Sequence, residues 1–379
     1  MRSNIFRISA GLAIIILITW FLLPKYMQKA LIYQKPGIRD LEIFENRMVK
    51  AGKPMAWPVD SLCNAEPISD SASAEFKKYE TVAYLVVKGG RIVHEEYWDG
   101  WNDSTVSNSF SMAKSIVSLL IGCLIEEKKV ALDDPVRKYI PELLDMKDHP
   151  VLIRHLLTMS SGLNWDESYS SLTSVTTEAY YGNDIQGLVT SLNPTEVPGK
   201  IHRYKSCDTQ LLGIIVERAS GMKVADYASL RLWQPLGAEF SAYWSLDSKD
   251  GNEKVYCCFN ATARDFARIG QMVLDSGMFN GRQVVPKDYI SEATSPATCL
   301  KDDEGKPCDY YGYQFWLTTY KGQRVIFARG ILGQYIFIIP ALNTVIVRLG
   351  HKRSDEYTHH TPMDAFTYIK EGIGLVTPK

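Results

Sequence analysis

Short strand-like runs, rich in β-branched and aromatic residues, lie mainly near the two ends of the chain. The clearest case is a hairpin in which the strand-like run 81–87 and the alternating run 91–97 flank Gly89 and Gly90, because a two-residue Gly-Gly turn suits the twist of paired strands. Residues 340–343 separate another pair of such runs. The pattern predicts strands over 81–87, 91–97, 311–317, 334–339 and 344–349.

The middle of the chain has helical periodicity instead. Residues 111–127 are apolar on nearly every side, which predicts a helix buried within the protein. Gly221 follows Ser220 at the end of another periodic segment, and glycine commonly follows the last turn of a helix. Further helices are expected over 151–159, 208–220, 262–276 and 361–375.

This order of elements predicts an α+β fold in one two-lobed unit rather than two tandem domains. Strands from both chain ends can form an antiparallel sheet with flanking helices, and the central helices form a second, all-α lobe. We expect the α/β lobe to comprise about 78–135 and 300–379, and the all-α lobe about 136–299. Residues 31–77 contain four prolines and are interpreted as a lead-in or linker.

The N-terminus departs most from a globular pattern, because an apolar, charge-free run extends from Ile8 to Leu23. As a helix this run would span roughly 24 Å, slightly less than the hydrocarbon core of a bilayer. Two arginines precede it, and Gln28 stands where a cleavage site ending at Ala30 would require a small residue. We predict a transmembrane signal-anchor over residues 1–30 with the rest of the chain exported, and a cleaved secretion signal is the alternative.

Composition mainly excludes classes of protein. The chain has 42 basic and 43 acidic residues and a net charge of -1, so it lacks the basic excess of nucleic-acid-binding proteins. Its seven cysteines leave at least one unpaired, and no C-x-x-C motif points to a zinc or thioredoxin-type site. Cys299 and Cys308 flank a polar loop, and the sequence is compatible both with a disulfide between them and with two free thiols.

Candidate chemistry begins at the start of the buried helix, in the motif Ser111-Met-Ala-Lys114. Residues three apart share a helix face, so the hydroxyl and the amine can meet. A lysine can take the proton of a serine if burial lowers its pKa, and a helix N-terminus favours negative charge beside it. Alone the motif is weak, because a capping serine and a solvated lysine at this spacing are common.

Several further stretches, in the same order, are similar to the serine β-lactamase and penicillin-binding-protein superfamily. The resemblance covers about residues 78–375 and is strongest to the class C β-lactamase-related branch, which includes esterases, D-peptidases and 6-aminohexanoate-dimer hydrolase. It implies a β-lactamase/transpeptidase-like fold for residues 78–379 and an acyl-enzyme mechanism without metal or organic cofactor. The stretches are HLLTMSSGL (155–163) and residues 198–222, 261–286, 311–316 and 329–334.

The resemblance implies that Ser111 is the nucleophile and that Lys114 and Tyr204 form its proton relay. Tyr204 matches the family tyrosine that hydrogen-bonds the nucleophile or the leaving group. Ser206 stands where the family usually has asparagine, and a hydroxyl cannot reproduce the paired donor and acceptor of a carboxamide. This departure at a substrate-binding position disfavours recognition of a β-lactam side chain.

The third family motif falls on residues 328–330, which lack the Lys-Thr or His-Thr pair that holds a β-lactam carboxylate. Ile331 matches the position whose backbone N–H completes an oxyanion hole with that of Ser111. Gly330 is expected to leave room for the substrate. Tyr169 aligns with a tyrosine that the nylon-oligomer hydrolase branch uses to hold the scissile amide nitrogen.

The sequence lacks the motifs of other enzyme classes, including G-x-S-x-G, H-E-x-x-H, Walker A and G-x-G-x-x-G. We therefore predict a serine hydrolase that cleaves a small amide or ester through an acyl-enzyme on Ser111. A β-lactamase or D,D-peptidase of the same fold is the alternative within this class. A non-catalytic binding or sensor module is the alternative from another class.

Overall fold

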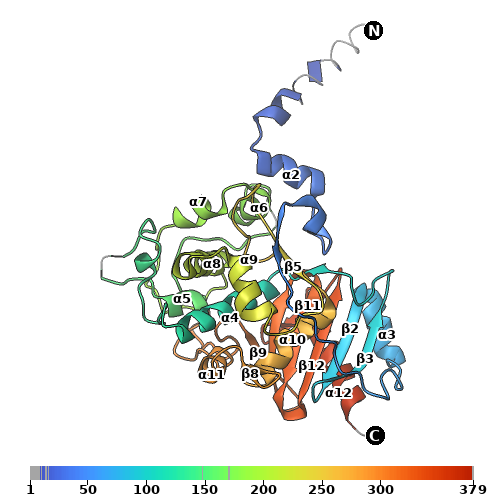
Figure 1. Cartoon of the computed structure of the whole chain (residues 1–379). Helices are drawn as coiled ribbons and strands as arrows, with labels where there is room; N and C mark the ends of the chain where they lie inside the picture. The colour runs from blue at the N-terminus through green and yellow to red at the C-terminus, as the bar shows by residue number, and fades with distance from the viewer. Residues whose placement is uncertain are drawn as a thin grey trace.

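The predicted strands and one further strand, β10, form a six-stranded antiparallel sheet of order β3-β2-β12-β11-β10-β9 (Figure 1). Both ends of the chain contribute to this sheet, as the sequence predicts. The computed structural model describes residues 9, 11–12, 15, 17–146, 148–169 and 171–377. The strands are β2 (Thr81–Lys88), β3 (Arg91–Tyr97), β9 (Trp316–Tyr320), β10 (Gln323–Gly330), β11 (Gln334–Ile339) and β12 (Thr344–Gly350).

Alternation along these strands separates two apolar cores, one on each face of the sheet. In β2, Ala83, Leu85 and Val87 belong to one core, whereas Tyr84 and Val86 belong to the other. Two helices cover each face, because each helix buries its apolar side against the sheet. The first face carries α4 (Met112–Glu126) and α10 (Ala263–Leu274), and the second carries α3 (Asp70–Lys78) and α12 (Met363–Val376).

Two strands of the sheet differ from the sequence prediction. Strand β9 begins at Trp316 instead of residue 311, and β10 was not predicted. The middle of β10, residues 325–328, is buried on both faces, so it is a continuous apolar run without polar alternation. Strands β11 and β12 are buried in the same way and were predicted, so burial on both faces does not explain why β10 was missed.

The middle of the chain forms a helical lobe beside the sheet, as predicted (Figure 1). Helix α8 lies at its centre and ends before Gly221, whose φ of 72° is the left-handed conformation that glycine adopts without a steric penalty. The α-helices of the lobe are α5 (Ile153–Leu157), α6 (Val175–Tyr181), α7 (Ile185–Thr190), α8 (Ser206–Ser220) and α9 (Val224–Ala228), and a π-helix spans Ser229–Trp233.

The prediction that residues 136–299 are all helical is wrong in part. Two strands from this range join a second, four-stranded sheet of order β1-β5-β6-β4, because their partners lie far away in the sequence. Helix α10 also falls in this range but packs on the main sheet. The small sheet consists of β1 (Asn46–Val49), β4 (Ser107–Asn108), β5 (Ala242–Ser245) and β6 (Phe259–Ala261).

Residues 31–77, interpreted from the sequence as a linker, are folded onto the rest of the chain. Strand β1 pairs with β5, and α3 packs against β2 and α12. Both elements are short, which is why the prolines around them dominated the sequence pattern. The remaining elements are α2 (Lys25–Tyr33), α11 (Lys287–Ala293), β7 (Met278–Phe279), β8 (Arg282–Gln283), β13 (Tyr357–Thr358), β14 (Thr361–Pro362) and 3-10 turns at Asp40–Ile43, Val136–Lys138, Ile331–Gly333 and Pro340–Leu342.

The predicted N-terminal anchor lies partly outside the described residues. Among the residues that the structure describes, no helix combines the length and the apolarity needed to cross a bilayer. Helix α2, which follows the apolar run, packs against α6 of the helical lobe (Figure 1).

Candidate active site

The backbone before α4 holds Ser111 at the junction of the two lobes. The Ser109 N–H donates to the carbonyl of Phe259 over 2.8 Å, which ties this segment to the small sheet. Phe110 has a φ of 45°, a left-handed conformation that is costly for a bulky side chain. Its N–H donates to Asn108 Oδ1 over 2.9 Å, and this bond helps to stabilise the turn. The turn therefore presents Ser111 in one fixed position.

Lys114 reaches the hydroxyl of Ser111 from within the protein. Its Nζ lies 3.0 Å from Ser111 Oγ and 2.7 Å from the carbonyl oxygen of Tyr256, so both hydrogen-bond partners are uncharged. The side chain is 1% exposed. Burial lowers the pKa of Lys114 to about 8, although the negative charge of Glu167 acts in the opposite direction. A substantial fraction of the amine is therefore neutral near pH 8 and able to accept a proton.

Tyr204 lies on the other side of the same hydroxyl. Its phenol shares a hydrogen bond with Ser111, and its ring centroid is 5.1 Å from Lys114 Nζ. Burial raises the pKa of Tyr204, and the charge of Glu167 raises it further. The phenol is consequently neutral at physiological pH and has a proton to donate. The structure thus brings Ser111, Lys114 and Tyr204 together, as the sequence predicts.

Glu167 organises the loop above these residues and was not predicted from the sequence. Its carboxylate accepts hydrogen bonds from the Ser206 N–H at 2.7 Å, the Ser206 hydroxyl at 2.6 Å and Trp165 Nε1 at 2.6 Å. The hydroxyl of Tyr169 donates to it as well. The hydroxyl proton of Ser206 is therefore directed to Glu167, and the predicted contacts of Ser206 and Tyr169 with substrate stay predictions.

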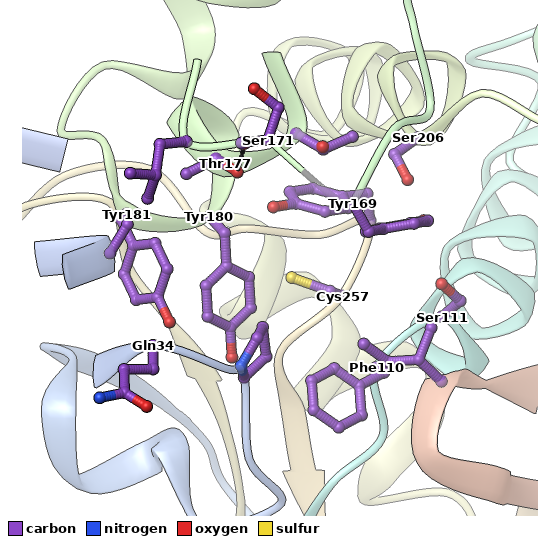
Figure 2. Close-up of a pocket in the computed structure, with 16 residues that line it drawn as sticks. Gln34, Phe110, Ser111, Tyr169, Ser171, Thr177, Tyr180, Tyr181, Ser206 and Cys257 are labelled. Atoms are coloured by element: carbon purple, nitrogen blue, oxygen red, sulfur yellow. Dashed lines mark hydrogen bonds between the residues drawn. The ribbon is translucent and has the colours of Figure 1, made fainter. Parts of the chain in front are cut away.

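A cavity of about 220 Å³ opens beside the nucleophile (Figure 2). In this view the rings of Tyr180 and Tyr181 face Phe110 and Ser111 across it, and Tyr169 lies above. Tyr204 instead borders a neighbouring surface hollow of about 590 Å³. Among the residues predicted for the site, those that line the cavity are Ser111, Tyr169, Ser206 and Ile331.

Gly330 provides a close approach between β10 and the turn before Ser111. A β-carbon at this position would lie 2.2 Å from the carbonyl oxygen of Ser109 and 3.1 Å from Cβ of Phe110. From the sequence, we expected Gly330 to leave room for the substrate. The structure gives a different reason, because the space that glycine leaves is filled by the chain itself.

Replacing Gly330 with alanine should therefore push β10 away from the turn that carries Ser111. We expect a loss of about 1–3 kcal/mol in the free energy of unfolding and a lower kcat, because Ile331 moves with Gly330. Gly374→Ala is the matched control, since a β-carbon there meets no atom within 4 Å. Urea unfolding and ester hydrolysis of both variants check this, and equal behaviour of the two would contradict it.

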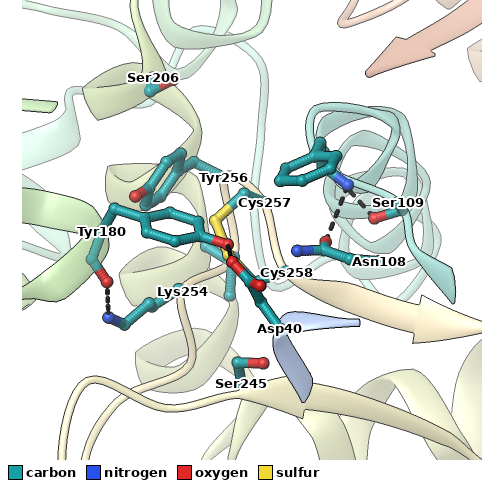
Figure 3. The surroundings of a disulfide bond; sticks show 12 residues. Asp40, Asn108, Ser109, Tyr180, Ser206, Ser245, Lys254, Tyr256, Cys257 and Cys258 are labelled. Atoms are coloured by element: carbon teal, nitrogen blue, oxygen red, sulfur yellow. Dashed lines mark hydrogen bonds between the residues drawn. A yellow bond between two sulfur atoms is a disulfide. The ribbon is translucent and has the colours of Figure 1, made fainter. Parts of the chain in front are cut away.

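A disulfide joins the adjacent residues Cys257 and Cys258 next to the site (Figure 3). Cys257 lines the cavity, and it directly follows Tyr256, whose carbonyl holds Lys114. The disulfide left open between Cys299 and Cys308 is not formed, because both residues are free thiols. Sequence reasoning missed the adjacent pair, since it considered only cysteines on either side of a loop.

Thiol counting tests this pairing directly. The chain has seven cysteines, of which five are free thiols in the structure. We expect alkylation of the unfolded, unreduced protein to modify five cysteines, and alkylation after reduction to modify seven. Mass spectrometry of the peptide containing residues 257–258 should show modification only after reduction. Modification of that peptide without reduction would contradict the pairing.

Within the described part of the chain, no group of three or more His, Cys, Asp or Glu side chains is arranged to hold a metal ion. His360 stacks on the ring of Tyr310 with centroids 3.6 Å apart.

Comparison with known proteins places this geometry in a family. A family model described as Beta-lactamase matches residues 70–364, which is most of the chain. The chain belongs to the Beta-lactamase family. The fold and the family resemblance predicted from the sequence are thereby confirmed.

This Beta-lactamase family member has relatives with different hydrolase names. It is 29% identical over 289 residues to a 6-aminohexanoate-dimer hydrolase of Paenarthrobacter ureafaciens, covering 71% of this chain and 72% of the relative. It is 27% identical over 218 residues to the esterase EstB of Burkholderia gladioli, covering 51% and 55% of the two chains. A solved structure of a Bacillus anthracis protein, described as a candidate 6-aminohexanoate-dimer hydrolase, superposes with a TM-score of 0.77 and 23% identity over 89% of this chain and 93% of that chain.

Two contributions to the site could not be found by the motif search in this Beta-lactamase family member. Tyr256 acts through its backbone carbonyl, so the identity of its side chain carries no signal. Glu167 stands two residues before Tyr169, but the sequence does not show that the loop folds back onto Ser206. Only sequence proximity to a predicted site residue could have drawn attention to it.

Proposed function

We propose that this protein is a serine hydrolase that cleaves a small amide or ester through an acyl-enzyme on Ser111. The proposal is carried by one observation, the buried amine of Lys114 at 3.0 Å from Ser111 Oγ, with a pKa lowered to about 8. A serine becomes an effective nucleophile when a positioned base takes its proton. This arrangement supports general-base activation of Ser111.

In the acylation step, Ser111 Oγ attacks the substrate carbonyl carbon while its proton passes to Lys114. The negative charge that develops on the carbonyl oxygen is held by the backbone N–H groups of Ser111 and Ile331. When the intermediate collapses, Tyr204 donates a proton to the leaving nitrogen or oxygen, and the bond to the leaving group breaks. The neutral phenol of Tyr204 supports this assignment.

Deacylation reverses these roles. A water molecule loses a proton to the Tyr204 phenolate and attacks the acyl carbon. When the bond to Ser111 Oγ breaks, Lys114 gives Oγ the proton it took during acylation, and the carboxylic acid is released. The Ser111–Lys114 hydrogen bond is then restored. Each turnover consumes one water and requires no electron transfer, so the side chains present suffice.

An amide or ester is favoured over a β-lactam by residues 328–330. They lack the Lys-Thr or His-Thr pair of the family motif, and Arg329 does not replace it. Its guanidinium lies 3.6 Å from the ring centroid of Trp316 and donates to the carbonyl of His360. Relatives named as a 6-aminohexanoate-dimer hydrolase and as an esterase are consistent with this preference.

A substrate panel tests the proposal. We expect the wild type to hydrolyse p-nitrophenyl esters or 6-aminohexanoate dimer and to turn over nitrocefin poorly, whereas Ser111→Ala should hydrolyse none of them. Rapid nitrocefin turnover would favour the β-lactamase alternative. Equal and negligible activity of wild type and Ser111→Ala on all substrates, including a D-Ala-D-Ala peptide, would favour a non-catalytic module.

We also propose that the catalytic unit is exported from the cytoplasm. The apolar run of residues 8–23 after two arginines supports this, and so does the disulfide at residues 257–258, because disulfides persist in oxidising compartments. Protease added to intact cells with a permeabilised outer envelope should digest the chain. Protection under these conditions, with digestion after lysis, would contradict export.

A further inference from the structure

We propose that the cavity beside Ser111 binds the acyl half of the substrate and accepts an uncharged, largely apolar acyl group. This inference rests on the proposed function, since only an acyl-enzyme places the acyl group next to Ser111. It goes further by assigning a substrate class to the cavity. It also identifies a part of the chain outside the matched family region as a wall of that cavity.

The lining of the cavity lacks formal charge. Of the described residues that line it, none is Asp, Glu, Lys, Arg or His. Its large surfaces are aromatic or aliphatic, and its polar groups are hydroxyls and one amide that bind uncharged groups. The surfaces that carry the argument are those of Phe110, Leu172, Tyr180, Tyr181 and Ile331.

Two carboxylates, Glu167 and Asp40, accept hydrogen bonds from residues of the cavity wall but are not part of its lining. Glu167 accepts hydrogen bonds from Ser206, Trp165 and Tyr169 behind the cavity wall. Asp40 accepts a hydrogen bond of 2.7 Å from the hydroxyl of Tyr180. An ammonium group in the cavity would lose its hydration without meeting a carboxylate among the described lining residues, which is unfavourable.

The leaving group has a different place to go. Tyr204, the proposed proton donor to the leaving group, borders the neighbouring hollow and not the cavity. That hollow is lined by charged residues, including Glu167, Arg203 and Asp303. If the leaving group lies on the Tyr204 side of Ser111, the uncharged cavity remains available for the acyl half of the substrate.

The N-terminal segment builds one wall of this cavity. Ala30, Gln34 and Pro36 line it, and Tyr33 stacks on Tyr181 with ring centroids 6.2 Å apart. This wall lies before residue 70, where the match to the family model begins. Selectivity for the acyl group therefore depends on a segment that belongs to this chain and not to the matched family region.

A matched pair of esters tests the proposal, because p-nitrophenyl hexanoate and p-nitrophenyl 6-aminohexanoate differ in the acyl half only by a terminal ammonium. We expect kcat/KM of the wild type to be at least tenfold higher for hexanoate. A ratio of one or below would overturn the proposal. The leaving group is identical in the two esters, so the ratio reports the acyl site alone.

An isosteric charge change inside the cavity should narrow this ratio. Gln34→Glu places a carboxylate in the wall and should raise the relative kcat/KM of the 6-aminohexanoate ester at least threefold. Gln186→Glu makes the same change on α7, away from the cavity, and should leave the ratio as in the wild type. An equal effect of both variants, or none from Gln34→Glu, would overturn the placement of the acyl group.

Binding to the Ser111→Ala variant separates this inference from the proposed function. We expect hexanamide to bind this variant at least tenfold more tightly than 6-aminohexanamide in a calorimetric titration. That result supports the cavity assignment even if the wild type hydrolyses no ester, in which case only the proposed function fails. Equal binding, or tighter binding of the amine, would overturn the cavity assignment even if hydrolysis is observed.

Discussion

Ser111→Ala and Lys114→Met are each expected to lower kcat/KM for an activated ester by at least 10³-fold, and the double variant should be no worse than the more damaged single variant. The two residues act as a unit, since the hydroxyl is a poor nucleophile until the amine takes its proton, and effects within such a unit are not additive. Steady-state kinetics of the three variants give this comparison. Additive losses would show that Lys114 acts independently of Ser111.

Lys254→Met is the matched control for Lys114→Met. Lys254 is also buried, burial lowers its pKa to about 7, and it too donates to a backbone carbonyl, that of Tyr180. It differs in that its Nζ lies 4.3 Å from the ring centroid of Phe44 rather than beside a serine hydroxyl. We expect this variant to keep its activity within about fivefold. A comparable loss in both variants would mean that removing any buried lysine disrupts the fold.

The Ser111–Lys114 pair also determines how kcat/KM depends on pH. Lys114 accepts a proton only as the neutral amine, so kcat/KM should rise with pH and reach half its plateau near pH 8, the value to which burial lowers the pKa of Lys114. The charge of Glu167 raises this pKa, so Glu167→Gln should move the midpoint to lower pH. Glu304→Gln, at an exposed residue, should not move it. If Glu167→Gln leaves the midpoint unchanged, the claim that the charge of Glu167 raises the pKa of Lys114 is contradicted.

The second large effect is expected for Tyr204→Phe, and it should depend on the leaving group. For an amide, whose leaving nitrogen must be protonated, we expect kcat to fall by about 10²–10³-fold, within the usual range for a lost general acid. For a p-nitrophenyl ester the loss should be at least tenfold smaller, since p-nitrophenolate departs without a proton. Kinetics on both substrate types give this ratio, and equal losses would contradict the assigned role.

Tyr311→Phe controls for the aromatic packing around Tyr204. The two rings lie with centroids 6.2 Å apart, and the Tyr311 hydroxyl is buried without a hydrogen-bond partner among the described residues. Its removal should leave kcat within about twofold for both substrate types. A loss as large as that of Tyr204→Phe would assign the effect to packing instead of proton transfer.

Local patterns in the sequence were sufficient to predict the centre of the site. Ser111 and Lys114 are one helical turn apart on a helix that is apolar on nearly every side, so their contact and the burial of the amine follow from the sequence. Tyr204 lies far along the chain, and its placement came from the family resemblance instead. In the fold, the glycine hairpin and the other strand-like runs were predicted for the same local reasons.

Features that depend on distant partners were not predictable. Strand β1 gains its structure only by pairing with β5, about two hundred residues later. The contact of Glu167 with Ser206 likewise depends on how a loop returns to the site.

Covalent labelling by a fluorophosphonate tests the central claim most directly, because the reagent phosphonylates an activated serine and needs no knowledge of the substrate. The account predicts one adduct per chain on the wild type, located by peptide mass spectrometry at Ser111, no adduct on Ser111→Ala, and much slower labelling of Lys114→Met. An unlabelled wild type, or equal labelling of wild type and Ser111→Ala, would contradict the account.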